Sequence, residues 1–279
     1  MRIWKWVGLG AALLAAAAAF GVYSTERAIA SFEARIARIA EALGAPTPRF
    51  SEIEDLPAPV QRYFAFVFPD GPTTARLARI SAEGRFRRPR TTTFNPMTAE
   101  QVVAIDAPAF MFSATTEMAP GLWARAYDFF ADGEMEMKAK ILSLITVVDE
   151  RETPELNAIS LRRWLLESAL FPQALLPGGP ARWEAVDADS ARLLIEAEGL
   201  RATMIARFDD VGRMTEMAAE EDGDLDTPYH GSGEHVTRGD YQRIGDVMIP
   251  MRFAISRAAD GEIHPFWEGR ITSVRFDAP

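Results

Sequence analysis

Residues 153–177, TPELNAISLRRWLLESALFPQALLP, form the only long helix-like segment between two groups of strand-like segments. Thr153 fits the N-cap position, Pro154 fits the first helical position, and Glu155 lies in the first turn, where negative charge is favoured. Apolar residues cover most of the circumference of this helix. Because such a helix is buried on more than one side, we expect both groups of strands to share one core with it.

Glu167 is the one charged residue in the apolar second half of this helix. In one interpretation its carboxylate faces a cavity and has a raised pKa. In the other, which is the more common arrangement, it pairs with Arg163 one turn earlier on a solvated edge.

Period-two alternation occurs on both sides of the helix and is clearest in residues 134–140, EMEMKAK, where charged and apolar side chains take opposite faces. Strands at this spacing, without helices between them, are typical of an antiparallel sheet. We therefore predict a mainly β fold of the α+β class: a curved antiparallel sheet or half-open barrel packed on the central helix. The predicted strands are residues 78–88, 98–105, 109–118, 122–130 and 134–148, then 182–187, 191–198, 202–209, 214–221, 235–243, 247–258 and 266–276.

Residues 6–23, WVGLGAALLAAAAAFGVY, carry no charge and follow the basic residues Arg2 and Lys5. At about 1.5 Å per helical residue, this run is long enough to cross a hydrocarbon core. A cleaved signal peptide is the alternative, but the A-x-A sequence at residues 28–30 lies beyond a charged pair. We predict an N-terminal transmembrane helix in residues 1–23, single-pass in the bacterial inner (cytoplasmic) membrane, with the C-terminal domain extracytoplasmic.

Three further segments complete the predicted organisation. Residues 24–44 form a juxtamembrane amphipathic helix, because Ile29, Phe32 and Ile36 recur at helical spacing. This helix is a packed stalk, an interfacial helix or, through residues 24–43, the contact surface of a homo-oligomer. Residues 45–74 form a connector with a short apolar helix at 60–68, and residues 75–279 form the β domain around the helix at 153–177.

Composition excludes several classes of function. The chain of 279 residues has a formal net charge of −10, 48% hydrophobic residues and no cysteine. A negative chain lacks the electropositive face that binding of nucleic acid needs. Without cysteine there are no disulfides, no thiolate nucleophile and no cysteine-based zinc site.

Residues able to bind a metal occur in two places. His230, Glu234 and His235 are weak candidates for a zinc site, because an i, i+5 spacing puts the two histidines on opposite faces of one strand. Residues 222–226, DGDLD, alternate carboxylates as calcium loops do, but the glycine and glutamate of such a loop are missing at the later positions. We predict no metal and no cofactor. The chain also lacks nucleophile and phosphate-binding motifs.

Large apolar side chains on the helix and nearby strands are candidates for a ligand pocket, although core packing uses the same residue types. The candidates are Trp164, Glu167, Leu170, Phe171, Trp183 and Tyr241.

Five short segments form a recognisable set: residues 56–63 (LPAPVQRY), 118–123 (MAPGLW), 164–172 (WLLESALFP), 182–184 (RWE) and 241–250 (YQRIGDVMIP). Together they resemble an uncharacterised bacterial family of membrane-anchored proteins, and the resemblance extends over residues 56–276. The strand-helix-strand plan is also similar to the lipoprotein-localisation-factor superfamily, which implies a half-open antiparallel barrel that holds lipid or acyl chains around helices. Neither resemblance implies catalytic residues.

These observations favour a non-catalytic, membrane-anchored binding protein for a lipid, an acyl chain of a lipoprotein or another apolar ligand. One alternative is an envelope scaffold that assembles through residues 24–43. Another is a hydrolase or metal-dependent enzyme that uses Glu167 or the group His230, Glu234 and His235.

Overall fold

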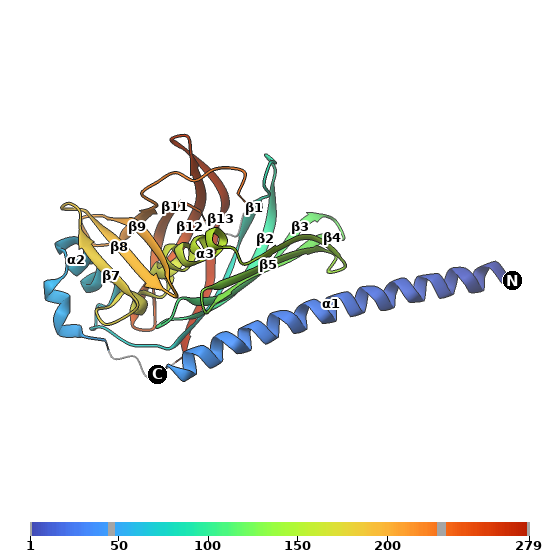
Figure 1. The fold of residues 1–279 in the computed structure, drawn as a ribbon, viewed down its shortest axis with the longest axis horizontal. Coiled ribbons are helices and arrows are strands. Elements are labelled where there is room, and N and C mark those ends of the chain that lie inside the picture. The colour runs from blue at the N-terminus through green and yellow to red at the C-terminus, as the bar shows by residue number, and fades with distance from the viewer. Residues whose placement is uncertain (1, 44–47, 228–232, 278–279) are drawn as a thin grey trace.

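The first and last strands of the β domain lie side by side in the middle of one antiparallel sheet (Figure 1). The computed structural model describes residues 2–43, 48–227 and 233–277, with the side chains of the first helix described from residue 16. Within these ranges, thirteen strands follow the order β6-β5-β4-β3-β2-β1-β13-β12-β11-β10-β9-β8-β7. The sheet is open and does not close into a barrel. The pairing of β1 with β13 joins the half β1–β6 to the half β7–β13.

The observed strands agree closely with the period-two pattern. Eleven of the twelve predicted segments correspond to a single strand with ends shifted by at most four residues, and the predicted short helix at 60–68 is α2. The first half contains β1 Leu77–Arg87, β2 Phe94–Ala104, β3 Ala109–Ala119, β4 Leu122–Ala131, β5 Glu134–Ile141 and β6 Ile145–Arg151. The second half contains β7 Ala181–Ala185, β8 Ser190–Ala197, β9 Leu200–Phe208, β10 Met214–Ala218, β11 His235–Ile244, β12 Val247–Ala259 and β13 Glu262–Asp277. The helices are α1 Arg2–Ala42, α2 Ala58–Val67 and α3 Pro154–Glu167, with 3-10 turns η1 Phe50–Asp55, η2 Ser168–Leu170 and η3 Pro172–Leu175.

The prediction of one strand over residues 134–148 was wrong. The chain turns between β5 and β6, where Leu142 and Ser143 have φ angles of 53° and 58°. Such angles are uncommon for residues other than glycine. Because this turn contains no glycine, proline or asparagine, the usual turn signal is missing from the sequence.

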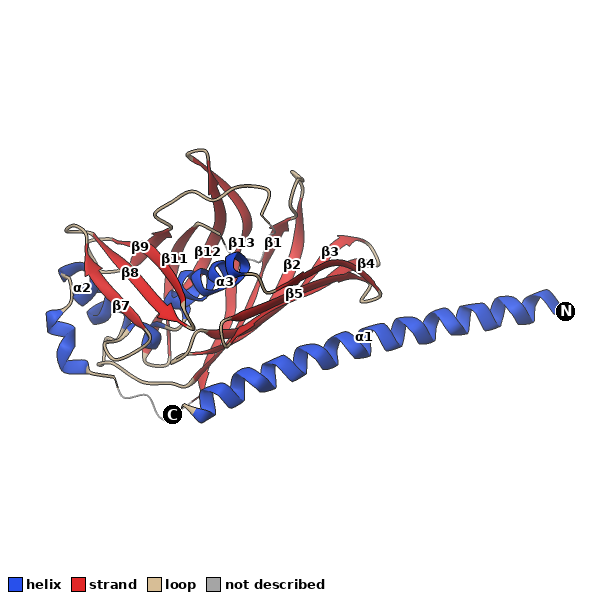
Figure 2. Ribbon diagram, in the orientation of Figure 1, coloured by secondary structure: helices blue, strands red, loops and turns tan. Residues whose placement is uncertain are grey.

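The central helix α3 lies inside the curve of the sheet (Figure 2). Its start is as predicted: the side chain of Thr153 accepts a hydrogen bond from the Leu156 amide at 3.1 Å. Its end is earlier than predicted, at Glu167 rather than near residue 177. Pro172 has no amide hydrogen and keeps Phe171 out of the helical region, at φ −142°, so 3-10 turns replace the helix there.

The second half of the sheet is filled by α3, the turns after it and α2. Leu161, Trp164 and Leu165 on α3 have no exposed surface and belong to one apolar core with Met204 and Val236 from the sheet. This arrangement confirms that the strands on both sides of the helix share a core with it.

The helix α1 lies against the outer face of β2, β3 and β4 (Figure 1). Ile29 and Ile36 pack on Met111 and Phe129 of the sheet, and the rings of Phe32 and Phe129 stack at 4.4 Å. The apolar stripe of residues 24–43 is therefore packed on the chain's own sheet, as in the stalk interpretation. A homo-oligomer through this segment stays a prediction.

The predicted anchor and the amphipathic segment form one continuous helix, Arg2–Ala42. Residues 1–15, most of the predicted anchor 1–23, lie outside the residues whose side chains are described, so the anchor stays a prediction. Where side chains are described, no helix combines the length and apolarity needed to cross a membrane.

Candidate functional site

A cavity of 570 Å³ lies on the inner face of the first half of the sheet, and Arg163 of α3 forms part of its lining. Most of its lining is aliphatic, aromatic or methionine side chain from β1 to β6 and β13. The volume falls in the range of about 300–1,000 Å³ that is usual for small-molecule pockets. We call this space the inner cavity; its apolar lining includes Met97, Phe112, Ala126, Met137, Ile141 and Val148.

A row of alanines across neighbouring strands creates this space. The strand registers pair Ala82 with Ala99, Ala99 with Ala114, Ala114 with Ala126, and Ala126 with Ala139. Directly paired residues point to the same face of a sheet. Five methyl groups therefore stand in line across β1 to β5, and three of them, Ala114, Ala126 and Ala139, line the inner cavity.

A buried ionic group from α3 and β4 forms the floor of the inner cavity. Arg163 donates hydrogen bonds to Asp128 Oδ2 at 2.5 Å and to Glu167 Oε1 at 3.2 Å. Glu167 also accepts a hydrogen bond from Gln101. The Arg163 guanidinium carbon lies 4.4 Å from the centroid of the Phe112 ring, a cation–π distance. These contacts hold Arg163, Asp128 and Glu167 at exposures of 1%, 2% and 4%.

Burial raises the pKa of the Asp128 carboxyl to about 7, although the Arg163 guanidinium lowers it in part. Asp128 Oδ1 has no hydrogen-bond partner among the described residues. Asp128 and Arg163 both line the inner cavity. The floor is thus a carboxyl group that changes charge near neutral pH and has one oxygen without a protein donor.

We expect this carboxyl to lower stability as the pH rises. Its pKa is above that of the unfolded chain, about 3.9, so the folded protein binds the proton more tightly. The stabilisation is complete below about pH 4 and is lost as the pH rises through about 7. Urea unfolding at several pH values should show the wild type losing stability relative to Asp128→Asn between about pH 4 and 7. Parallel curves for the two proteins would exclude this titration.

The mouth of the inner cavity is marked by its exposed lining residues. They belong to the turn after β1, to strand β6 and to residues 225–227. An exposed ion pair between Arg90 and Asp226, at 3.4 Å, links two of these segments. Val147 lines the cavity and is 53% exposed, and Ile145 on the same strand is 63% exposed. The rim therefore carries an apolar side chain in contact with water.

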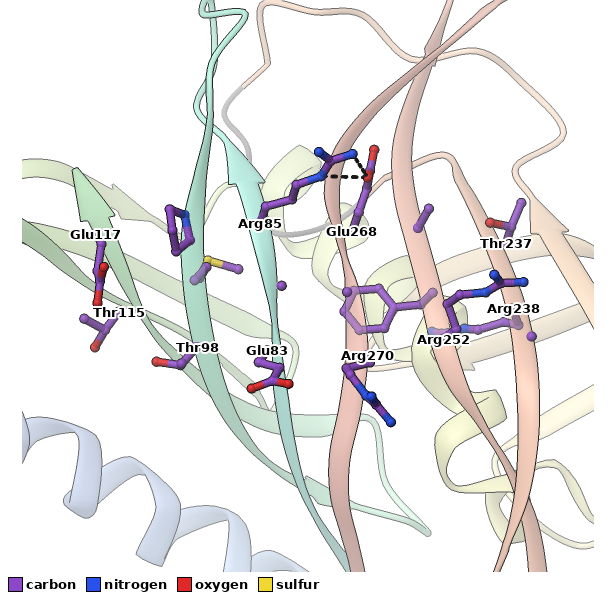
Figure 3. Close-up of a pocket in the computed structure, with 17 residues that line it drawn as sticks. Glu83, Arg85, Thr98, Thr115, Glu117, Thr237, Arg238, Arg252, Glu268 and Arg270 are labelled. Carbon is purple, nitrogen blue, oxygen red and sulfur yellow. Dashed lines mark hydrogen bonds and ion pairs between the residues drawn. The ribbon is translucent and has the colours of Figure 1, made fainter. Parts of the chain in front are cut away.

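A larger, shallow groove of 880 Å³ lies on the opposite, outer face of β1, β13, β12 and β11 (Figure 3). Arg85 donates two hydrogen bonds to Glu268, at 3.0 and 2.7 Å. Glu83, Arg252 and Arg270 are exposed in the same groove. Its charged, solvated lining offers little apolar burial, so the inner cavity is the better candidate for a ligand site.

The residues predicted to line a ligand pocket lie mainly in the filled part of the core. Trp164 and Phe171 are fully buried with ring centroids 5.3 Å apart, and Trp164 donates a hydrogen bond to the Ala104 carbonyl at 3.2 Å. Leu170 is buried in the same core, beside a space of 20 Å³. Trp183 and Tyr241 pack against that core from its edge; Trp183 donates to the Leu175 carbonyl at 3.1 Å and Tyr241 to the Met214 carbonyl at 2.8 Å.

Glu167 forms the ion pair of the second interpretation, but inside the core. It pairs with Arg163 one turn earlier, but the pair is buried rather than on a solvated edge. The reason is that Asp128 on β4 supplies a second carboxylate for the same guanidinium. Glu167 contributes to the floor of the inner cavity through this pairing.

The candidate metal residues are only partly described, because His230 lies outside the described residues. Glu234 is buried and pairs with Arg162 at 2.7 Å and Arg257 at 2.9 Å. His235 Nε2 lies 3.6 Å from a carboxylate oxygen of Glu216. Within the described parts of the chain, no three histidine or acidic side chains come close enough to hold a metal ion. In the 222–226 loop, the Asp224 carboxylate accepts backbone hydrogen bonds from Asp226 and Thr227.

Asp128 and the alanine row are absent from the sequence-based candidates. A signal for Asp128 exists in the sequence: Ala124, Ala126, Asp128 and Phe130 alternate on one strand face, and a charge among them breaks the apolar pattern. No such signal exists for the alanine row, because its members are neighbours only through the strand registers.

Comparison with known proteins adds a family but no activity. The search of curated proteins found no match. Among solved structures, a DUF1329 family protein from Desulfovibrio piger is similar at 11% identity and a TM-score of 0.37, with 83% of this chain and 94% of that chain covered. The model of a family of unknown function, DUF6920, matches residues 54–276. The chain therefore belongs to the DUF6920 family.

Proposed function

We propose that this protein is a non-catalytic binding protein that holds a lipid, an acyl chain or a related apolar ligand in the inner cavity. The observation that carries the proposal is the alanine row. Three of its alanines line 570 Å³ of largely apolar space beside the packed core around α3. An empty apolar cavity lowers the stability of a packed core. Binding of an apolar ligand explains why the sequence keeps such a cavity.

The energetics of such binding are favourable. Each methylene group that leaves water contributes about 0.8 kcal/mol. A chain of about ten methylenes therefore contributes about 8 kcal/mol before the entropic costs of binding. Apolar contact is therefore the main favourable contribution to binding, and the aliphatic lining of the inner cavity is suited to it.

The place of action that we propose is the extracytoplasmic side of the bacterial inner membrane. Support comes from the uncharged run at residues 6–23 and from the exposed Val147, which lines the cavity, with Ile145 exposed on the same strand. Exposed apolar side chains that cluster at one site are typical of contact with a membrane or another apolar partner. A lipid held at a membrane surface also fits the resemblance in plan to the lipoprotein-localisation factors.

Native mass spectrometry of the full chain, released from mild detergent, tests the proposal. We expect a 1:1 adduct with the mass of a cellular lipid, or uptake of one lipid after incubation with extracted bacterial lipids. A chain that stays free of adducts in both experiments would contradict the proposal. The matched control is Ala126→Trp, which takes up part of the inner cavity and should show much less adduct.

A further inference from the structure

The unpartnered oxygen of Asp128 limits the chemistry of the ligand. Asp128 is 2% exposed and lines the inner cavity, and no donor among the described residues reaches its Oδ1 atom. A buried acceptor without a donor costs about 1–3 kcal/mol and more when it is charged. A ligand that supplies a donor at this point removes that cost.

The surroundings of Asp128 determine the type of donor. Above its titration range the carboxylate accepts hydrogen bonds only. The charged groups facing it are Arg163 and Glu167 from α3, while its neighbours on the adjacent strands are Phe112 and Met137. Arg163 is already engaged by both carboxylates. An anionic ligand group would meet two negative charges, whereas a neutral hydroxyl meets one open acceptor.

We propose that the ligand is a neutral amphiphile that enters with a hydroxyl group first and donates a hydrogen bond from it to Asp128 Oδ1. This inference rests on the proposed function and specifies the ligand within it. The apolar body of the ligand then lies along Ala114, Ala126 and Ala139. The end that follows it reaches the mouth between β6 and residues 225–227.

Three twelve-carbon probes test the inference: 1-dodecanol, dodecyl methyl ether and dodecanoate. They compete with a neutral fluorescent probe, N-phenyl-1-naphthylamine, bound to the full chain in a lipid-free amphipathic polymer. At about pH 8.5, where Asp128 is ionised, dodecanol should bind at least about tenfold more tightly than the ether, since hydrogen bonds to charged groups are the strong ones. Dodecanoate should bind most weakly.

Two further measurements distinguish a hydrogen bond between the ligand hydroxyl and Asp128 from an effect of ligand polarity alone. At about pH 5.5 the protonated carboxyl donates to either oxygen, so the difference between alcohol and ether should shrink to about twofold. In Asp128→Asn the difference should also shrink, because the acceptor is no longer charged. The ligand series on the wild type keeps the test valid if this variant folds poorly.

The outcomes distinguish the two proposals. Equal binding of dodecanol and its ether at about pH 8.5, or tightest binding of dodecanoate, would overturn the hydroxyl inference and leave the apolar binding function intact. Failure of all three probes and of the fluorescent probe to bind would overturn the binding function itself.

Discussion

Ala126→Trp is expected to abolish binding of apolar ligands while the protein stays folded. Ala126 stands in the middle of the alanine row and lines the inner cavity. An indole group at this position takes the space that about four methylene groups of the ligand would occupy. Without the burial of these methylenes, binding is weakened by about 3 kcal/mol, which is more than a hundredfold in affinity. Titration with N-phenyl-1-naphthylamine measures the binding, and thermal unfolding measures the stability.

Ala185→Trp is the matched control, because Ala185 is exposed on the edge strand β7, outside the inner cavity. This control should bind like the wild type. If Ala126→Trp binds normally, the ligand lies elsewhere. If Ala126→Trp instead loses the 1–3 kcal/mol that is typical of overpacking, the inner cavity does not have the room that its volume indicates.

Arg163→Leu is expected to destabilise the protein by about 3–5 kcal/mol, because it leaves two buried carboxylates without their cation. Asp128 and Glu167 are both buried and both hydrogen-bonded to this guanidinium. Urea unfolding at neutral pH gives the change in free energy. The loss should be smaller at about pH 5, where Asp128 holds a proton in the folded state.

Arg182→Leu is the comparison, since Arg182 and Glu196 form an exposed pair with side chains 65% and 50% exposed. Removing an exposed pair costs at most about 1 kcal/mol. Equal losses in the two variants would show that the pair at the floor of the inner cavity is no more important than one on the surface.

The fold was largely predictable from local patterns. Period-two alternation and turn residues such as Asp132-Gly133, with φ angles of 55° and 78°, located most strands. The turn at Leu142 and Ser143 was missed because tertiary contacts, rather than turn-forming residues, impose it. The early end of α3 was predictable in principle, because Pro172 has a known effect on the preceding residues.

The candidate site was much less predictable, because it depends on strand register. An alanine in a strand gives no signal by itself, and the alignment of five alanines across β1 to β5, three of which line the cavity, is set by the strand registers. Asp128 and Arg163 are 35 residues apart and meet only when α3 packs inside the sheet. Glu167 was recognised from the sequence because it is a single charged residue within one apolar helical segment.

Photolabelling locates the ligand and tests the central claim most directly. A dodecanol carrying a diazirine in the middle of its chain is bound to the full-length protein, irradiated and mapped by peptide mass spectrometry. Our account predicts labels on inner-cavity residues such as Ala126, Met137 and Ile141, which Ala126→Trp removes and Ala185→Trp retains. Labels confined to the outer groove around Arg252 and Arg270, or labels unchanged in Ala126→Trp, would contradict it.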